Sequence, residues 1–463
     1  MCETVAGCAL RRPECGARGT PRVVNTVRTR RRGAKARPLS SSHRARRGEC
    51  HFVPVVGVDG CKTYVHHHIE PTKTHTKRCG VIYLDSAATS FPKEHHVVDA
   101  MKSYAERGTS PGRSGHRLSA WAEGQVWAAR ESLADLVKCI DPERVTFSLN
   151  ATMSLNAVVH HLGSIGGRVL TSAFEHNSVV RPLHTAAQEG SVRHEIIPPS
   201  TSGPFDLDRL QEQLLAGGVA GVIVTWASNV SGSVLPIREI SEICREAGVF
   251  IAVDGAQALG YLDVDAGLAD VLVFAGHKGL GGPLGVGGAV VGEGVRLSPF
   301  VTGGSGGRSE SRDHPCWLPW SQEAGTQNGI GIAGLGAALR LLDGAEIARR
   351  RRRATDLRER FVTGLSGGGA VTLIESPSAE ESVGVVSFRM NRVTPSVAAS
   401  LLEERFDILV RAGLHCSPLA HETLGTGDGG TVRVSFGPRT TTNEVDLALA
   451  AVQSISSSSS ERK

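Results

Sequence analysis

Long hydrophobic runs are absent from this 463-residue sequence. No stretch approaches the roughly 18 to 20 consecutive apolar residues of a membrane-spanning helix, so we expect no membrane partner. Aromatic residues are also scarce, at 5%, which disfavours a protein that binds nucleic acid by stacking bases on aromatic side chains. Glycine, by contrast, is plentiful with 55 residues, and such a turn-rich composition is more typical of an enzyme.

Cysteine and charge both divide the chain at about residue 80. Residues 1–80 carry 17 Lys and Arg side chains against 5 Asp and Glu, whereas residues 81–463 carry 34 against 41. The larger part is therefore acidic, and we expect no nucleic-acid binding by it. It holds only four of the ten cysteines, and their irregular spacing indicates a reducing compartment rather than a disulfide framework: Cys139, Cys244, Cys316 and Cys416.

The basic segment 1–80 has no sustained hydrophobic period, so we expect most of it to be disordered. Its Arg and Ser content fits an organellar transit peptide, and without such a peptide we expect the protein in the cytoplasm. A plainer interpretation is that translation starts near Val81 and that the segment is upstream reading frame. A metal site is the weakest alternative, because the candidate ligands match no common zinc spacing: Cys61, His66, His67, His68, His75 and Cys79.

From Val81 onward, short apolar runs alternate with helical patterns. Helices are expected over residues 153–162 and 236–247, and strands at six places: residues 144–148, 169–172, 221–226, 249–254, 270–274 and 285–291. Strands separated by helices indicate an α/β domain, with a mostly parallel sheet that helices cover on both faces.

The pattern changes near Gly344. A long Arg-rich helix over residues 345–365 precedes strands at 383–390 and 431–435, which predicts a smaller α+β domain over residues 344–455. The serine run at residues 456–460 is expected to be a frayed tail within a terminal segment, 456–463.

Polar residues follow five of the expected strands. Ligands of open parallel sheets bind beyond the carboxyl ends of the strands, so these groups are expected to converge on one cleft. Taken singly, each is more often a turn, cap or solvated residue, and only their joint placement at strand ends indicates a site. The set consists of Asn150, Ala151, Thr152, Glu175, His176, Asn177, Asn229, Asp254, Gln257, His277 and Lys278.

Pyridoxal phosphate is a cofactor that uses such groups. It needs a lysine amine for covalent attachment, a carboxylate beside its ring nitrogen and a cup for its phosphate. We expect Lys278 to attach it and Asp254 to keep the ring nitrogen protonated, because a nearby opposite charge favours the charged form. The remaining expected roles are Gln257 at the phenolic oxygen, His176 against the ring, and His277 and Thr152 at the phosphate.

Several of these segments resemble class V aminotransferases. The pyridoxal-phosphate signature is matched by Asp254-Gly255-Ala256-Gln257 followed by Gly276-His277-Lys278-Gly279. Residues 83–89 and 323–328 also match, and the resemblance extends from Val81 to about Ile455. The stretch Arg411-Ala412-Gly413-Leu414-His415-Cys416, with residues 431–435 after it, resembles the cysteine desulfurase branch. Within that branch it is similar to the group with a short cysteine loop, which also acts on selenocysteine.

The resemblance implies a fold-type-I α/β protein whose large domain, residues 81–343, holds a mostly parallel seven-stranded sheet. It also implies a homodimer with the active site at the subunit interface, where Thr326 would reach the phosphate of the neighbouring subunit. Arg433 would bind the substrate carboxylate, and Asn229 would lie near the substrate. Cys416 would take sulfur from L-cysteine as a persulfide, leaving alanine. An acceptor protein would then carry the sulfur to iron–sulfur cluster or cofactor assembly, and selenocysteine is an alternative substrate.

Cys416 must be a thiolate to attack sulfur, so it needs a base or a setting that stabilises the negative charge. His415 and His421 are close in sequence, but neither is assigned as that base. The glycines and the proline that follow indicate a loop rather than a core strand.

Three positions depart from the family pattern. Ala275 stands where Ser or Thr is usual, and Arg439-Thr440 stands where an aromatic–Asn pair is usual. In Gly307-Arg308, the arginine adds a charge where the branch tends to have small polar residues. Ala275 removes a hydroxyl donor to the phosphate, and one such hydrogen bond to a charged group contributes about 1.5 to 3 kcal/mol. Two alternatives therefore stay open. One is another class V enzyme, an aminotransferase or epimerase, in which Cys416 is incidental. The other is a non-catalytic sulfur-carrier scaffold of the same fold.

Overall fold

The computed structural model describes residues 52–56, 62–66, 80–306, 310–366, 369–374, 378 and 381–458. The chain divides into two units, residues 1–77 and 78–463. In the first, β1 (Phe52–Val56) pairs with β2 (Lys62–His66) as an antiparallel hairpin. The Val, Phe, Thr and Tyr content of this hairpin suits strands, and the disorder expected for most of residues 1–80 stays a prediction. The Arg-rich patches, Cys61 and Cys79 lie outside the described residues.

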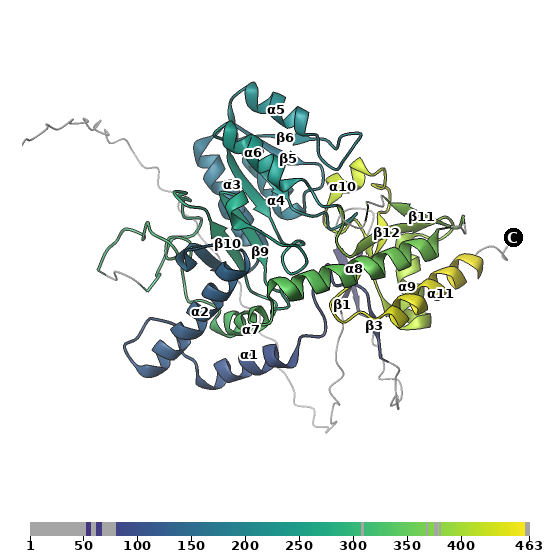
Figure 1. The fold of residues 1–463 in the computed structure, drawn as a ribbon, viewed down its shortest axis with the longest axis horizontal. Helices are drawn as coiled ribbons and strands as arrows, with labels where there is room; N and C mark the ends of the chain where they lie inside the picture. Colours follow the sequence, from purple (N-terminus) through teal and green to yellow (C-terminus); the bar gives the residue numbers. More distant parts are fainter. Residues whose placement is uncertain are drawn as a thin grey trace, which may run out of the picture. The chain divides into compact units, whose positions relative to one another are not determined.

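The second unit is built around a seven-stranded sheet in the order β4-β10-β9-β8-β7-β5-β6 (Figure 1). Neighbouring strands from β5 to β9 are parallel, and β10 runs antiparallel to both β4 and β9. The predicted mostly parallel α/β sheet is thereby confirmed. Its strands are β4 (Val145–Ser148), β5 (Arg168–Ser172), β6 (Arg193–Ile197), β7 (Val219–Thr225), β8 (Phe250–Asp254), β9 (Val271–Ala275) and β10 (Gly287–Val291).

Alternating side chains of these strands supply two separate cores, one on each face of the sheet. On β9, Leu272 and Phe274 join one apolar cluster, whereas Val271 and Val273 join the other. The first cluster also takes residues from α2 (Arg117–Leu136), α5 (Leu207–Leu215), α6 (Ile237–Glu246) and α7 (Gly329–Leu339). The second takes residues from α3 (Ala151–Ile165) and α4 (Asn177–Gln188). Because helices cover both faces of the sheet, the ends of its strands are the places that stay accessible. The helix α1 (His95–Arg107) contacts α7.

A second, antiparallel sheet has the order β11-β12-β15-β14. Its strands are β11 (Val371–Ile374), β12 (Val385–Met390), β14 (Arg411–Gly413) and β15 (Thr431–Ser435). Its core includes residues of α8 (Gly344–Leu365), α9 (Pro395–Phe406) and α11 (Thr442–Ser458). Figure 1 shows one end of the long helix α8 running beside α11. The two-residue strand β3 (Ile82–Tyr83) pairs with β13 (Ile408–Leu409), and Ile82 together with Leu84, which follows the strand, joins this core.

Helix α11 corrects the expected frayed tail, because it continues through Ser458. It buries Val452 and Ile455 against the small sheet, and the hydroxyls of Ser456 and Ser457 donate to main-chain carbonyls one turn earlier. The helix therefore extends as far as its buried face does.

Among the residues that the structure describes, no helix combines the length and hydrophobicity that a membrane crossing requires.

Candidate active site

A cavity of about 210 Å³ lies at the carboxyl ends of the parallel strands. The segments that follow β4, β5, β7, β8 and β9 each contribute to its lining, together with β14 and β15 of the small sheet. It brings together ten residues predicted to form the site: Asn150, Ala151, Thr152, His176, Asn229, Asp254, Gln257, His277, Lys278 and Arg433. Their convergence follows from the sheet, since the carboxyl ends of parallel strands share one edge.

Lys278 lies in the turn after β9 and is half-buried. Loss of water around its amine lowers the pKa to about 8, and the nearby Asp254 charge opposes part of that effect. The backbone before it is held firmly, because the His277 carbonyl oxygen accepts hydrogen bonds from Thr89 Oγ1 (3.0 Å), Ser90 N (3.0 Å) and Lys93 Nζ (2.9 Å). The backbone before Lys278 is thus fixed in place, and with a pKa of about 8 the amine is mostly protonated near neutral pH and loses its proton more easily than an ordinary lysine.

Asp254 closes β8 and is 5% exposed. Burial raises the pKa of its carboxyl, while the Lys278 charge lowers it. One carboxylate oxygen, Oδ1, accepts from Ala256 N at 2.9 Å. Gln257, one turn on, donates from Nε2 to the Ala87 carbonyl oxygen at 3.0 Å.

The opposite wall of the cavity suits an anion. Ala151 and Thr152 form the start of α3, where main-chain N–H groups point out of the helix and its dipole is positive. His277 Nδ1 is buried and lacks a hydrogen-bond partner among the described residues. Burial and the Lys278 charge lower the pKa of His277 to about 4, so the ring is neutral and can donate one N–H. Beside it, Thr152 Oγ1 lies 2.7 Å from Ser178 Oγ, which lies 2.8 Å from His176 Nδ1.

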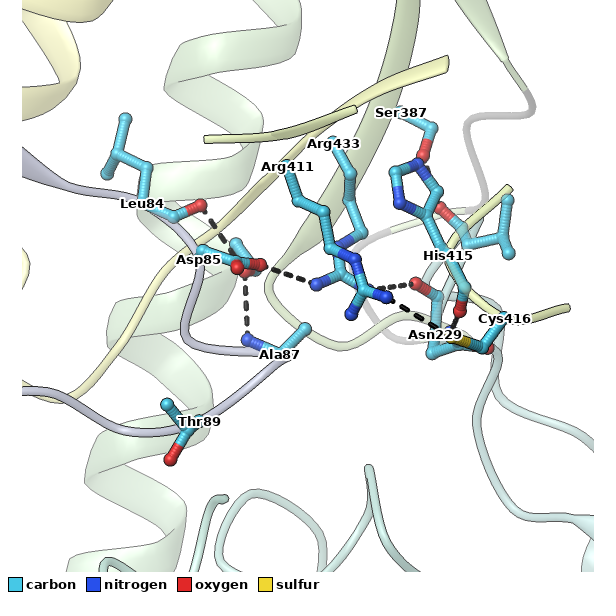
Figure 2. A network of polar contacts seen from close by, with 12 residues as sticks. Leu84, Asp85, Ala87, Thr89, Asn229, Ser387, Arg411, His415, Cys416 and Arg433 are labelled. Atoms are coloured by element: carbon cyan, nitrogen blue, oxygen red, sulfur yellow. Dashed lines mark hydrogen bonds and ion pairs between the residues drawn. The ribbon is translucent and has the colours of Figure 1, made fainter. Parts of the chain in front are cut away.

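Arg433 and Arg411 lie on the third side, on neighbouring strands of the small sheet (Figure 2). The Arg433 side chain is 1% exposed; it donates from Nη2 to Asp85 Oδ1 at 2.5 Å and from Nη1 to the Asn229 carbonyl at 3.1 Å. Arg411 donates from Nη2 to Cys416 Sγ at 3.2 Å. Asp85 and Arg411 both fall within segments that resemble the family, but no local pattern in the sequence indicates a role for either side chain.

Cys416 lies in a short loop between β14 and α10 (Pro418–Thr423) and is exposed. His415 and Cys416 both have left-handed backbone conformations, with φ of 50° and 61°. The side-chain amide of Asn229 bridges this loop, because Nδ2 donates to the His415 carbonyl (2.8 Å) and Oδ1 accepts from Ser417 Oγ (2.7 Å). Asn177 N adds a bond to the Cys416 carbonyl at 2.7 Å. Asn229 thus lines the cavity as predicted, but both polar atoms of its side-chain amide form hydrogen bonds with the Cys416 loop.

The thiol opens onto a groove that adjoins the Lys278 cavity. Thr152, His176 and Ser178 line both hollows, so the groove at Cys416 and the Lys278 cavity share one wall. The imidazoles of His415 and His421 are turned to other partners: His415 Nε2 lies 2.9 Å from Thr431 Oγ1, and His421 Nδ1 lies 2.7 Å from Thr426 Oγ1.

Burial lowers the pKa of His415 to about 2 and that of His421 to about 4, so both rings are neutral. The polar contact of Cys416 Sγ is with Arg411, not with either histidine.

Two predicted features lie away from this cavity. Thr326 is exposed and lines a different cavity of about 300 Å³, together with Ser148 and Phe300. Its expected contact is with a neighbouring subunit, so its role stays a prediction. Arg439 also lies outside the lining and pairs with Glu94 at 3.6 Å, and Gly307-Arg308 falls outside the described residues.

The groups present fit pyridoxal phosphate. A lysine amine, a buried carboxylate, an imidazole, a helix N-terminus and an unpartnered imidazole nitrogen surround one cavity, which is the donor set that the cofactor requires. Ala275 lines the same cavity without a hydroxyl, so the phosphate cup relies on the other donors.

Comparison with known proteins places these features in context. The family described as Aminotransferase class-V matches residues 82–448. The chain is 30% identical over 394 residues to a probable cysteine desulfurase of Pyrococcus abyssi, covering 81% of this chain and 94% of that protein. It is 31% identical over 375 residues to a probable cysteine desulfurase of Methanothermobacter thermautotrophicus, covering 79% and 92%.

Solved structures give the same picture. The apo structure of a cysteine desulfurase from Thermococcus onnurineus superposes with a TM-score of 0.76 at 30% identity, covering 82% of this chain and 95% of that one. The cysteine desulfurase CsdA of Escherichia coli does so with a TM-score of 0.72 at 28% identity, covering 81% and 94%.

Proposed function

The chain belongs to the class-V aminotransferase family, and from that membership we propose that it is a pyridoxal-phosphate-dependent cysteine desulfurase. It converts L-cysteine to L-alanine and keeps the sulfur as a persulfide on Cys416. The observation that carries the proposal is the placement of Cys416, whose thiol opens onto a groove that adjoins the Lys278 cavity and contacts Arg411. The similarity to cysteine desulfurases over about four fifths of the chain supports it.

The cofactor would be held by Lys278 at its aldehyde carbon and by Asp254 at its ring nitrogen. The start of α3, Thr152 and His277 would hold the phosphate. When bound, pyridoxal phosphate supplies a sink for the electrons of the substrate's Cα–H bond. Lys278 suits proton transfer at that carbon, because a pKa of about 8 lets the amine take up and release a proton near neutral pH.

The sulfur step depends on Cys416 and Arg411. The Cys416 thiolate attacks the sulfur of the bound cysteine, so that an S–S bond forms while the C–S bond breaks. The bonding electrons pass to the carbon side, and a proton added there completes alanine. The Arg411 guanidinium, 3.2 Å from Sγ, stabilises the negative charge that this attack requires. Because Cys416 is exposed, the persulfide can be passed to an acceptor protein.

The finer parts of the proposal concern assembly and partners. We assign residues 81–343 to a large domain and 344–455 to a small one, and two copies to a homodimer. Exposed apolar side chains that line the Thr326 cavity support the second copy: Leu149, Phe300 and Val301. Thr326 would then meet the partner's phosphate site. The sulfur would serve iron–sulfur cluster or cofactor assembly, with selenocysteine as the alternative substrate.

The test is the variant Cys416→Ala, with Cys316→Ala as the matched control because Cys316 is also an exposed free cysteine. Sulfide and alanine are measured with L-cysteine, and absorbance reports the lysine-bound cofactor. We expect Cys416→Ala to keep the cofactor band and release no sulfide, while Cys316→Ala matches the wild type. Full sulfide release by Cys416→Ala would make another class V activity the better assignment. Lys278→Ala should lose the band and any borohydride-reducible lysine adduct.

A further inference from the structure

Glu175, the residue before His176, is a buried carboxyl group that the proposed mechanism does not use. It is 0% exposed. Its Oε1 atom accepts hydrogen bonds from Ser172 Oγ at 2.5 Å and from Thr225 N at 2.9 Å. Ser172 ends β5 and Thr225 ends β7, and these two strands are neighbours in the large sheet. One oxygen atom therefore joins the ends of two strands, directly before the segment that carries His176.

This carboxyl group supports one wall of the Lys278 cavity. Thr225 lines the cavity together with His176 and Asp254. In the sheet, Thr225 is the partner of Asp254, which ends the neighbouring strand β8. Because Glu175 holds Thr225 and directly precedes His176, it contributes to the placement of both residues that are expected to face the cofactor ring.

The surroundings of Glu175 favour its uncharged form. Among the described residues no cation pairs with it, and its buried Oε2 atom has no hydrogen-bond partner. A buried carboxylate without a cation is so unfavourable that the group takes up a proton instead. Burial raises the pKa of Glu175 to about 8; the Asp254 charge adds to the rise, and the two hydrogen bonds offset part of it. The adjacent His176 ring is neutral as well, because burial lowers its pKa to about 3.

We propose that Glu175 is a positioning residue that works as an uncharged carboxylic acid: it joins the ends of β5 and β7, and it thereby fixes the His176 ring at the cofactor without placing a second negative charge near Asp254. The inference rests on the proposed function, because it takes pyridoxal phosphate as the occupant of the Lys278 cavity. A second carboxylate at this position would favour a proton on Asp254 and so weaken the charge that is expected at the ring nitrogen.

The first test determines the charge of Glu175 from the stability of the full chain without cofactor. The unfolded chain releases this proton above about pH 4.3, whereas the folded chain keeps it until about pH 8, so a rising pH favours unfolding. Glu175→Gln is uncharged at every pH. Relative to this variant, the wild-type unfolding equilibrium constant in denaturant titrations should rise about tenfold per pH unit between about pH 5 and pH 8, and it should level off above that range.

Glu195→Gln is the matched control for this measurement. Glu195 is paired with Arg168 at 2.7 Å, and the hydrogen bond from Arg168 lowers the pKa of its carboxyl. The ratio of its unfolding constant to that of the wild type should therefore stay constant between about pH 5 and pH 8. A constant ratio for Glu175→Gln over the same range would show that Glu175 is charged in the folded chain, and it would overturn the proposal.

The second test asks whether Glu175 acts through His176. Dissociation constants of pyridoxal phosphate are measured at pH 7 by absorbance titration of the full chain freed of cofactor. We expect Glu175→Ala to weaken binding at least about fivefold in the wild-type background but less than about twofold in the His176→Ala background, because residues that act as a unit are not additive. Glu175→Gln keeps the Oε1 acceptor and should bind the cofactor within about twofold of the wild type.

Equal weakening in the two backgrounds would mean a general structural role and would overturn the proposal. Ser172→Ala removes one of the two hydrogen bonds to Glu175, and it takes the place of Glu175→Ala in the comparison if that variant does not fold. Neither test depends on sulfide release, so a missing desulfurase activity would count against the proposed function alone.

Discussion

Replacing Asn229 by alanine should loosen the Cys416 loop while leaving the cofactor in place. The side chain is 7% exposed and donates to the His415 carbonyl while it accepts from Ser417. These two bonds hold a pair of consecutive left-handed residues, His415 and Cys416. A left-handed conformation costs a non-glycine residue about 1 to 2 kcal/mol, so the loop needs such bonds to keep its shape.

The free-energy cost to the loop follows from the polar groups that the substitution leaves without a hydrogen-bond partner. A buried donor or acceptor left without a partner costs about 1 to 3 kcal/mol, and Asn229→Ala strands the His415 carbonyl and the Ser417 hydroxyl. The observed loop conformation is therefore disfavoured by about 2 to 6 kcal/mol, of which about 1.4 kcal/mol already corresponds to a tenfold change in population. We expect the loop to open instead, and Cys416 to occupy its attacking position in a minority of molecules.

The assay separates the two halves of the reaction. In a single turnover with L-cysteine, the change in cofactor absorbance should keep its wild-type rate, while persulfide formation and sulfide release slow at least about tenfold. Ser417→Ala loses only one of the two hydrogen bonds, so its rates of persulfide formation and sulfide release should lie between those of Asn229→Ala and the wild type. Asn391→Ala is the control, because it removes a surface hydrogen bond to the Gly369 carbonyl. Sulfide release within twofold of the wild type would refute the reasoning, and a slowed absorbance step would place the role of Asn229 at the cofactor.

Three further outcomes are expected. Cofactor uptake by the apo-protein should quicken with pH, reach half of its maximal rate near pH 8 and level off about one unit higher, because attachment needs the neutral amine and burial lowers the Lys278 pKa to about 8; a rise that continues to pH 10 would contradict this. Glu323→Ala should lower the free energy of unfolding by about 3 to 5 kcal/mol in denaturant titrations, because it leaves Arg130 buried and unpaired. Lys93→Met should speed cofactor loss on dialysis, with Lys93→Arg closer to the wild type, because Lys93 donates to the His277 carbonyl.

The central sheet could be predicted because its strands are continuous apolar runs closed by polar residues. The strand β6 was missed for the opposite reason: it lies at the sheet edge, and its sequence Arg-His-Glu-Ile-Ile is largely exposed or half-buried. An edge strand buries too little to impose a pattern on its residues. The helical end of α11 was also missed, because a serine run resembles a tail unless the buried face beneath it is known.

Some residues of the candidate site could likewise be predicted from the sequence, and others could not. Residues that follow strands, such as Asp254 and Lys278, could be placed together from topology alone. The bond between Asp85 and Arg433 joins residues 348 positions apart, and no local pattern encodes it. The engagement of Asn229 with the Cys416 loop is likewise a tertiary contact, between the segment after β7 and the loop after β14.

One short segment, residues 82–90, contacts β13, Arg433, Gln257 and the carbonyl before Lys278. Its first residues pair with β13, and Asp85 holds Arg433. Ala87 accepts from Gln257 beside the expected ring position, while Thr89 and Ser90 donate to the carbonyl that precedes Lys278. The cofactor residues come from the large sheet and the substrate arginine from the small one, so the distance between them is set partly by this segment. Its match to the family opening, Tyr83 to Thr89, is therefore explained by geometry: a change of length here would move the carboxylate-binding residue relative to the amine with which it must work.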